Sequence, residues 1–361
     1  MEPLKNMFHR KVIEALAHAI KTNDKAFKSN QFVNAVIDNQ WEKRELKDRI
    51  FHTAVSLAEF LPNDYEKATV IIQKASKILP AGFEQMPLPT YVEHYGVNHF
   101  NTSMKTLEII TQGSTGEFAI RPFLKKDSVK TLKKMENWAR HKNEHVRRLA
   151  SEGCRPRLPW GGNFDEAIRN PGIIVPILET LKNDDSLYVR KSVGNSLNDI
   201  SKDNPDVALE TSIRWLKEDH EHARWIVKKG LRGLLKQAHP KSLELFGYTN
   251  PKSISIHDFE LKENTVKIGS RLNFEFSLSN ESKTDSKIRA EYLIDYCKKS
   301  GRSTKVFQIA EFELPAKKKR KFKKYQSFAD MSTRKHIPGT HFIAIRVNGV
   351  IKQSLIFEVI K

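Results

Sequence analysis

Residues 188–202 read YVRKSVGNSLNDISK, and this stretch decides how the first two thirds of the chain are interpreted. Its apolar residues recur at spacings of four, four and three, as Val189, Val193, Leu197 and Ile200. Such spacing places them on one stripe of an α-helix, with Asn195 and Asp199 on a polar flank beside it. The stretch therefore predicts a helix with one buried face.

The same pattern recurs on both sides of this helix. Residues 222–236 read HARWIVKKGLRGLLK, 34 positions later, and residues 145–150 read HVRRLA, 43 positions earlier. Each copy opens with a ring-bearing residue, a small or apolar residue and an arginine, and then continues as a helix. Periods of roughly 34 to 45 residues with two helices per unit are typical of HEAT-like repeats, which stack into an α-solenoid with a concave binding face. A non-repetitive helical bundle is the alternative.

In the rest of the chain before Tyr248, apolar residues also recur at helical spacing. Pro and Gly separate segments of helical spacing, and short turns between such segments favour paired antiparallel helices. The spacing predicts helices over 44–60, 65–79, 128–140, 205–217 and 221–237.

After Pro251 the apolar residues alternate, which is typical of strands. The predicted strands are 254–261, 272–279, 288–296, 305–314, 342–347 and 355–359. Asn348-Gly349 between the last two predicts a type I′ hairpin. About seven short strands in such a length favour an immunoglobulin-like β-sandwich. We therefore predict a multidomain α and β protein, with an α-solenoid at residues 1–249 and a β-sandwich at 250–361.

Charge points to a polyanionic partner. The chain has 62 Lys and Arg against 43 Asp and Glu, a net charge of +19. Residues 251–361 hold 23 basic and 12 acidic residues, a net of +11, and the first 250 residues supply the other +8. Such an excess favours nucleic acid as a partner, although it also serves merely to keep a protein in solution.

Several classes of protein are excluded. The two cysteines, Cys154 and Cys297, lie too far apart for a CxxC redox motif and are too few for a disulfide scaffold or a cysteine-rich zinc site. No apolar run reaches the roughly 18 residues of a membrane-spanning helix, and the N-terminus does not resemble a signal peptide. We therefore expect a soluble intracellular protein.

Residues 143–160, NEHVRRLASEGCRPRLPW, carry the most informative chemistry. The predicted helix ends early at Gly153 and Pro156, and a turn fixed by prolines then displays two arginines and Trp160. A guanidinium pairs well with phosphate, and an indole stacks on a base or sugar. The alternative is that Trp160 only fills the gap where the helix breaks.

Together these motifs resemble the bacterial AlkC-type alkylpurine DNA glycosylases, which belong to the AlkC/AlkD superfamily of HEAT-like-repeat enzymes. The resemblance covers roughly residues 4–247, and one branch of the AlkC group carries an appended immunoglobulin-like domain. It rests on EFAIRPF at 117–123, the stretch 143–160, SLYVR at 186–190, NSLNDISK at 195–202 and RWIV at 224–227.

This resemblance implies hydrolysis of the N-glycosidic bond of cationic N-alkylated bases in duplex DNA. The candidates are N3-methyladenine, N3-methylcytosine and N1-methyladenine. A base alkylated on a ring nitrogen is already positively charged, so it is a good leaving group that needs little help from a general acid. The sugar then develops oxocarbenium character, which a carboxylate stabilises while it orients a water molecule.

By resemblance, the catalytic residues are Glu152, Asp199, Glu117 and Trp160. The predicted DNA-binding residues of the same domain are Arg148, Arg155, Arg157, Arg190 and Lys229. The expected partner is double-stranded DNA containing alkylated bases, bound by a monomer in the bacterial cytoplasm near the nucleoid. No metal, cofactor or membrane is expected.

Each predicted catalytic carboxylate also has a purely structural interpretation. Glu117 can cap a helix that follows residues 114–116, and Asp199 can pair with Lys202 or Arg190. Glu152 can bridge to Arg148, one turn earlier on the same helix. The alternative function is accordingly a non-enzymatic HEAT-repeat DNA-binding or scaffold protein.

Residues 317–324 read KKKRKFKK, the densest charge cluster of the chain. We predict that this lysine run contacts the DNA backbone through Lys318, Lys319 and Arg320. The alternative is an edge strand whose lysines prevent aggregation. The bacterial resemblance disfavours a third reading, a nuclear localisation signal.

Overall fold

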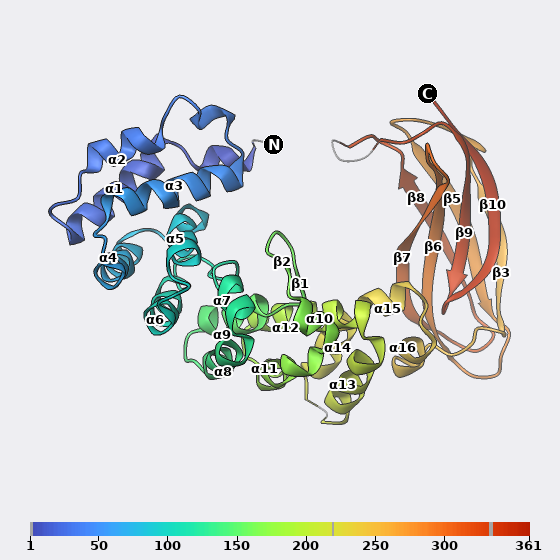
Figure 1. The fold of residues 1–361 in the computed structure, drawn as a ribbon. Coiled ribbons are helices and arrows are strands. Elements are labelled where there is room, and N and C mark those ends of the chain that lie inside the picture. Colours follow the sequence, from blue (N-terminus) through green and yellow to red (C-terminus); the bar gives the residue numbers. More distant parts are fainter. Residues whose placement is uncertain (1–2, 219, 332–334) are drawn as a thin grey trace. The chain divides into compact units, whose positions relative to one another are not determined.

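The computed structural model describes residues 3–218, 220–331 and 335–361. Its contacts divide the chain into two compact units, Met1–Leu231 and Arg232–Lys361, here called unit 1 and unit 2. Unit 1 is helical and unit 2 is mainly β-sheet (Figure 1), as predicted from the change from helical spacing to alternation of the apolar residues. None of the helices in the described ranges combines the length and apolar character needed to cross a membrane.

In unit 1, the helices pack against near neighbours in the sequence, as in a solenoid (Figure 1). Short 3₁₀ helices (η) and a two-stranded hairpin, β1 (Arg157–Leu158) and β2 (Gly162–Asn163), interrupt the series. The helices are α1 (Arg10–Asn23), α2 (Ser29–Val36), α3 (Leu46–Phe60), α4 (Tyr65–Ile78), α5 (Pro87–Tyr95), α6 (Phe100–Ile110), α7 (Arg121–Lys126), α8 (Ser128–Trp138), α9 (Glu144–Gly153), α10 (Asp165–Arg169), α11 (Val175–Leu181), α12 (Leu187–Asp203), α13 (Pro205–Lys217) and α14 (Ala223–Gly230).

The predicted repeat is confirmed, because its three copies form α9, α12 and α14, with α12 packed against both of the others. Small residues allow this close packing. A Cβ on Gly230 of α14 would lie 2.4 Å from the Leu197 side chain of α12. The prediction of a single helix over 221–237 is wrong, because α14 ends at Gly230 and a new helix starts at Arg232. Gly230 and Gly233 are poor helix formers at this break.

Unit 2 is a sandwich of two sheets with strand orders β4-β10-β9-β6-β7 and β3-β5-β8 (Figure 1). Its core between the sheets is rich in Phe, Ile, Leu and Val, and all six predicted strands are present. Two short helices, α15 (Arg232–Lys236) and α16 (Pro240–Leu245), precede the strands. The strands are β3 (Ile254–Leu261), β4 (Thr265–Lys267), β5 (Arg271–Asn280), β6 (Ser286–Cys297), β7 (Arg302–Leu314), β8 (Lys319–Ser327), β9 (Gly339–Val347) and β10 (Val350–Ile360).

The hairpin between β9 and β10 has the predicted turn. Val347 pairs with Val350, which leaves a two-residue loop of Asn348 and Gly349. Their φ angles of 45° and 85° are both positive, as a type I′ turn requires. Asn348 also donates from its side chain to the Thr249 carbonyl at 3.0 Å.

The short helices are fastened to the five-stranded sheet by buried charges. Arg346 on β9 is bonded to Glu291 on β6, and it also donates to the Lys236 carbonyl of α15 at 2.8 Å. Lys287 donates to the Phe246 carbonyl, just after α16, at 2.7 Å. These bonds explain why the contacts place α15 and α16 with the sheets, whereas the predicted boundary lies at residue 249.

His341 makes the stability of unit 2 sensitive to pH. Its ring is buried beside Tyr296, Phe328 and Phe357, and this burial lowers its pKa. Because the unfolded chain binds the proton more tightly, stability is greatest above the ordinary histidine pKa of about 6.5 and is lost as the pH falls. We expect the hydrogen-exchange protection of β9 amides to fall between about pH 7 and pH 5.5, and His341→Phe to flatten that dependence.

His257→Phe is the matched control, because His257 lies on β3 with an exposed side chain. Protection of β9 in this variant should follow the wild type. An unchanged pH dependence in His341→Phe would refute the assignment.

Candidate active site

Helices α9 and α12 position the two main predicted carboxylates. Asn143 caps α9 by accepting a hydrogen bond from the backbone of His145, and the helix ends at Gly153, directly after Glu152. Asp199 lies in the fourth turn of α12. A hydrogen bond of 2.7 Å between the hydroxyls of Ser151 and Ser192 joins the helices in between. Packing of the repeat thus brings carboxylates from two copies to one place.

Arg155 lies between these carboxylates. Its Nη1 donates to Glu152 Oε1 at 2.6 Å, and its Nε donates to Asp199 Oδ2 at 2.8 Å. All three residues are buried, with exposed fractions of 6% for Arg155, 5% for Glu152 and 1% for Asp199. Burial alone would lower the pKa of the guanidinium, but the two carboxylates raise it above its usual range. The Arg155 guanidinium therefore stays charged between the two carboxylates.

The bridge continues on both sides. Arg148 Nη2 lies 3.6 Å from Glu152 Oε1, while its Nη1 donates to Glu117 and to the Thr115 hydroxyl. At the other end, Lys202 Nζ donates to Asp199 Oδ1 at 2.8 Å. The result is one chain of alternating charges, here called the ionic chain: Glu117, Arg148, Glu152, Arg155, Asp199 and Lys202.

Some of the ion pairs expected from the purely structural interpretation of the carboxylates are present, and others are not. The pairs Asp199–Lys202 and Glu152–Arg148 are both present. Arg190 does not reach Asp199, because its Nη1 donates to the carbonyls of Asp184 and Asp185. Glu117 accepts hydrogen bonds from the Thr115 hydroxyl and from Arg148. The ionic chain joins all three predicted catalytic carboxylates, which no pairwise interpretation foresees.

Trp160 occupies the turn between β1 and β2. Its φ of 66° lies in the left-handed region that residues other than glycine rarely adopt, and its side chain is 60% exposed. This exposure rules out a gap-filling role. Lys47 of α3 donates to the Trp160 carbonyl at 2.7 Å, and it also lies 5.8 Å from the indole centroid. The turn is thus held from outside in a costly conformation, which is typical of functional sites.

Arg121 anchors the same hairpin from below. Its guanidinium is buried and donates to the carbonyls of Gly153, Arg155 and Gly162 at 2.9 to 3.0 Å. These bonds tie β2 to the end of α9. Sequence reasoning named neither Arg121 nor Lys47 as a site residue. Arg121 lies in the quoted family motif at 117–123, but only the tertiary contacts show what Arg121 and Lys47 hold.

The predicted DNA-binding residues are dispersed. Arg148 and Arg155 belong to the ionic chain, while Arg157 forms a more exposed pair with Asp203 at 2.7 Å. Lys229 lies along Gly194 of α12 with its amine 5.8 Å from the Trp225 ring centroid. The three predicted DNA-binding residues of unit 2 lie at the start of β8: Lys318 directly precedes the strand, and Lys319 and Arg320 begin it. Lys319 pairs there with Asp258, and Arg320 packs over Phe312.

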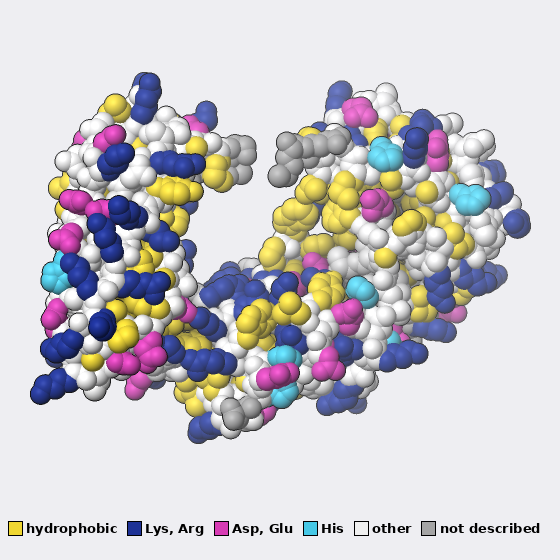
Figure 2. Space-filling model, turned by 180° about the vertical axis from the view of Figure 1, so that it is seen from behind, with side chains coloured by type: hydrophobic (Ala, Val, Ile, Leu, Met, Phe, Trp, Pro, Cys, Tyr) yellow, Lys and Arg dark blue, Asp and Glu magenta, His cyan; other side chains and the backbone are white. Residues whose placement is uncertain are grey.

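The lysine run therefore continues into an edge strand, the position expected if its lysines prevent aggregation. β8 is the last strand of the three-stranded sheet and pairs only with β5 among the described strands. Figure 2 shows Lys and Arg side chains spread over unit 2 with Asp and Glu among them. Lys321 and Lys323 both bind Glu275 of β5, so part of the charge is neutralised within the sheet. An edge position is compatible with a contact to phosphates.

Comparison with known proteins places these features in context. Residues 115–234 match the family model described as DNA alkylation repair enzyme. Residues 255–361 match the model described as the C-terminal Ig-like domain of the uncharacterised protein YhaZ. The chain is 41% identical over 360 residues to the uncharacterized protein YhaZ of Bacillus subtilis, covering 99% of this chain and 100% of that protein.

A solved structure is similar over the full length of both chains. It is the Pseudomonas fluorescens alkylpurine DNA glycosylase AlkC, bound to DNA containing an abasic site analog. The sequence identity is 35% and the TM-score is 0.96. The likeness thus extends over both the helices and the sandwich.

The ionic chain yields a prediction about stability. Arg155→Met keeps the apolar bulk but leaves Glu152 and Asp199 buried without their shared cation. Breaking a buried ion pair in this way costs about 3 to 5 kcal/mol. We expect the urea midpoint, followed by tryptophan fluorescence, to fall accordingly. All five tryptophans lie in unit 1, so this signal reports the correct unit.

Arg157→Met is the control, since Arg157 is two residues away and also pairs with an aspartate, but in solvent. Its midpoint should shift much less. Equal shifts in the two variants would contradict the structural importance of the buried bridge.

Proposed function

The chain belongs to the AlkC-type alkylpurine DNA glycosylases, and on this premise we propose that it excises cationic N-alkylated bases from duplex DNA. Its candidate substrates remain N3-methyladenine, N3-methylcytosine and N1-methyladenine. The observation that carries the proposal is the ionic chain beside the exposed Trp160 turn. It combines fixed carboxylates for a developing cation with an aromatic surface for a sugar or base.

The chemistry assigns different tasks to the carboxylates. When the glycosidic bond breaks, its electron pair leaves with the base and neutralises it, while positive charge develops on the sugar. A carboxylate near the anomeric carbon stabilises this charge and orients the water that replaces the base. The water gives its proton to this carboxylate as its oxygen bonds to the sugar carbon.

Glu152 is best placed to act on the sugar and the water. Arg155 and Arg148 both approach Oε1, and among the described residues no hydrogen bond or ion pair engages Oε2. Asp199 differs, because Arg155 holds one oxygen and Lys202 the other. We therefore assign Asp199 to fixing Glu152 through Arg155. Glu117, whose Oε1 is likewise unengaged among the described contacts, is the second carboxylate facing the cation.

Arg155 receives a new role in this proposal. Its burial and its two carboxylate partners suit a positioning residue better than the phosphate contact expected from the sequence. Arg148 and Arg157 are more exposed than Arg155 and keep the proposed role at the DNA. Trp160 is proposed to lie against the deoxyribose or the lesion base.

The decisive experiment uses duplex DNA with one N3-methyladenine or N3-methylcytosine, followed by alkaline cleavage of abasic sites. Strand breaks at the lesion are the expected result. Their absence with protein shown to be folded would favour a non-enzymatic DNA-binding or scaffold protein.

Glu152→Gln tests the catalytic assignment. Losing one preorganised electrostatic group should lower the single-turnover rate about a hundredfold, equivalent to about 3 kcal/mol. Affinity for DNA containing an abasic-site analogue should change little, because the group acts mainly in the transition state. Asp199→Asn should also lower the rate more than the affinity.

Glu144→Gln is the control, because Glu144 is an exposed carboxylate at the other end of the same helix. Its rate should match the wild type. If affinity in Glu152→Gln falls as much as the rate, Glu152 binds DNA rather than acting in catalysis.

We further propose that residues 250–361 form an auxiliary DNA-binding domain beside the catalytic residues 1–249. The lysine run supports this proposal, since it concentrates positive charge at an edge strand of a unit with a large basic excess. Deleting residues 251–361 should weaken DNA binding and activity. That deletion also removes the sheet that covers α15 and α16, so point substitutions are the cleaner test.

Neutralising the predicted contacts should reduce the salt dependence of binding. Each lost phosphate contact lowers the slope of log affinity against log salt by about 0.9, so three lower it by about 2 to 3. The slope should be measured by anisotropy with undamaged duplex DNA. The substitutions are Lys318→Gln, Lys319→Gln and Arg320→Gln in one variant.

The matched variant removes three other exposed lysines of unit 2 and has the same net charge. It carries Lys267→Gln, Lys283→Gln and Lys299→Gln. Equal slopes in the two variants would show that net charge, and not the lysine run, determines binding.

A further inference from the structure

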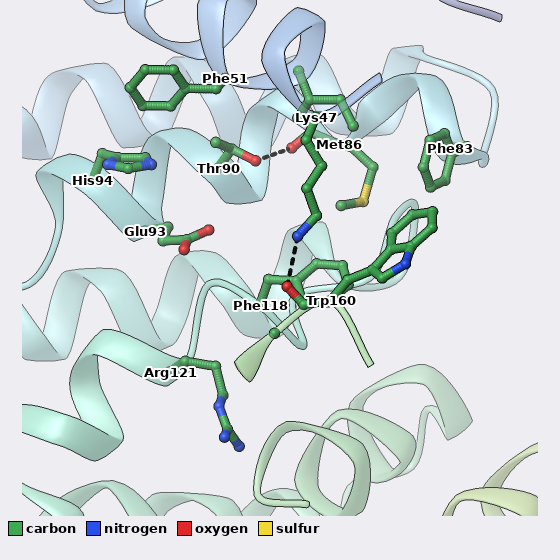
Figure 3. A pocket seen from close by; sticks show the side chains of 12 residues that line it. Lys47, Phe51, Phe83, Met86, Thr90, Glu93, His94, Phe118, Arg121 and Trp160 are labelled. Carbon is green, nitrogen blue, oxygen red and sulfur yellow. Dashed lines mark hydrogen bonds between the residues drawn. The ribbon is translucent and has the colours of Figure 1, made fainter. Parts of the chain in front are cut away.

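A cavity of about 210 Å³ opens beside the Trp160 turn (Figure 3). It is formed by α3, α5 and the 3₁₀ helix η3 (Phe83–Gln85), together with Phe118 and the turn itself. We call it the Trp160 cavity and define it by Lys47, Phe51, Glu93, Phe118 and Trp160. None of the roles proposed above uses it, although it shares Trp160 with the candidate active site.

We propose that the Trp160 cavity binds one planar heteroaromatic base, the base excised by the reaction. This inference deepens the proposed function and rests on it. The size agrees, because the cavity is smaller than the roughly 300 Å³ at which pockets for drug-sized ligands begin. A base without its sugar and phosphate is a ligand of that smaller class.

The walls suit a flat aromatic ring. Phe51 is 46% exposed on one side, and Trp160 and Phe118 stand on the other (Figure 3). His94 supports the Phe51 ring at a centroid distance of 4.7 Å in an edge-on arrangement. Stacking of a base on an aromatic side chain contributes about 1 to 3 kcal/mol, whichever base is present. Exposed aromatic walls therefore favour a nucleobase over an aliphatic ligand.

Two polar side chains of the lining, Glu93 and His94, are left to recognise the edge of such a ring. The Thr90 hydroxyl donates to the Met86 carbonyl, Lys47 donates to Trp160, and Arg121 donates to the carbonyls that hold the hairpin. The Glu93 carboxyl points into the cavity, and no hydrogen bond or ion pair engages it among the described residues (Figure 3). It is therefore available to a ligand.

The Glu93 carboxyl suits the edge of a base. Burial raises its pKa, although His94 and Lys47 act in the opposite direction. A carboxylate accepts a hydrogen bond from the amino group of a base, and its protonated form also offers a donor to the adjacent ring nitrogen. Lys47 and Arg121, both positively charged, line the same space and oppose entry of a cation. The alkylated base is a cation in DNA and becomes neutral when it leaves, so the cavity suits the product.

The position of the cavity agrees with this order of events. Glu117 of the ionic chain and Phe118 of the cavity are adjacent in the chain, and Trp160 lies at the turn between the two sites. A sugar held at the carboxylates and a base that departs past Trp160 would therefore occupy neighbouring spaces.

The test is titration of free 3-methyladenine into the protein without DNA, followed by calorimetry or saturation-transfer NMR. Phe51→Ala and Glu93→Leu should each weaken binding at least tenfold, while Glu93→Gln, which keeps a donor and an acceptor, should retain it. The controls are Tyr95→Ala and Glu59→Leu, an exposed aromatic and an exposed carboxyl on α5 and α3 outside the cavity. Both should bind like the wild type, and thermal melting should confirm that every variant folds.

A second arm separates the free base from a base still attached to DNA. Duplex DNA carries 2-aminopurine opposite an abasic-site analogue, and its fluorescence is compared in wild type and Phe51→Ala. If free 3-methyladenine binds and the 2-aminopurine fluorescence is the same in wild type and Phe51→Ala, the cavity is a site for the released product. If the fluorescence differs between the two proteins, the cavity recognises a base that is still part of the DNA.

No saturable binding of 3-methyladenine, together with fluorescence that is independent of Phe51, overturns the inference. The alkaline cleavage assay on the same protein keeps the two proposals apart. Excision without base binding refutes the cavity proposal alone. Base binding without excision refutes the proposed function but leaves a base-binding cavity.

Discussion

The buried bridge in which Arg155 joins Glu152 to Asp199 is the interaction on which the rest of the site depends. Removing three charged groups from water is expensive, and a hydrophobic cluster of equal volume would be at least as stable. The bridge therefore contributes less through stability than through geometry. It aligns the last turn of α9, the segment that leads into β1 and the fourth turn of α12. Carboxylates held in this way need not reorganise when charge develops beside them.

The Trp160 turn extends the same principle. Arg121 donates to the carbonyls of Gly153, the last residue of α9, and of Arg155, the central residue of the bridge. The same arginine therefore connects the bridge to the hairpin. Lys47 reaches the other side of the turn from α3. An exposed indole with a left-handed backbone is thus supported from two sides of the solenoid. Trp160 lines the cavity and is also one of the residues proposed to contact the lesion, so the two proposals meet at this turn.

The net charge of +19 acquires different meanings in the two units. In unit 1, the ionic chain contains three acidic and three basic groups and is neutral as a whole, so carboxylates are present without adding net repulsion toward DNA. In unit 2, lysines stand at an edge strand, a position where lysines discourage edge-to-edge pairing, and the proposed function also has them contact phosphates. In the proposed function, the same excess of basic residues accompanies a site for a developing cation in unit 1 and a surface for an anion in unit 2.

Local patterns in the sequence determined the secondary structure and the class of each unit. Helical spacing located α12 and α13, and the alternation of apolar residues located β3. Asn348-Gly349 specified the turn between β9 and β10. Each of these features depends on residues close together in the chain. The break at Leu231 was not predicted, although Gly230 and Gly233 mark it, and only the packed helices show that Gly230 lies against Leu197 of α12. The resemblance named Glu117, Glu152 and Asp199, but spacing could not show that Arg155 joins two of them. Nor could it place Glu93 in a cavity with Trp160. Periodicity reports which face of an element is buried, whereas partners far apart in the chain are decided only when the elements pack.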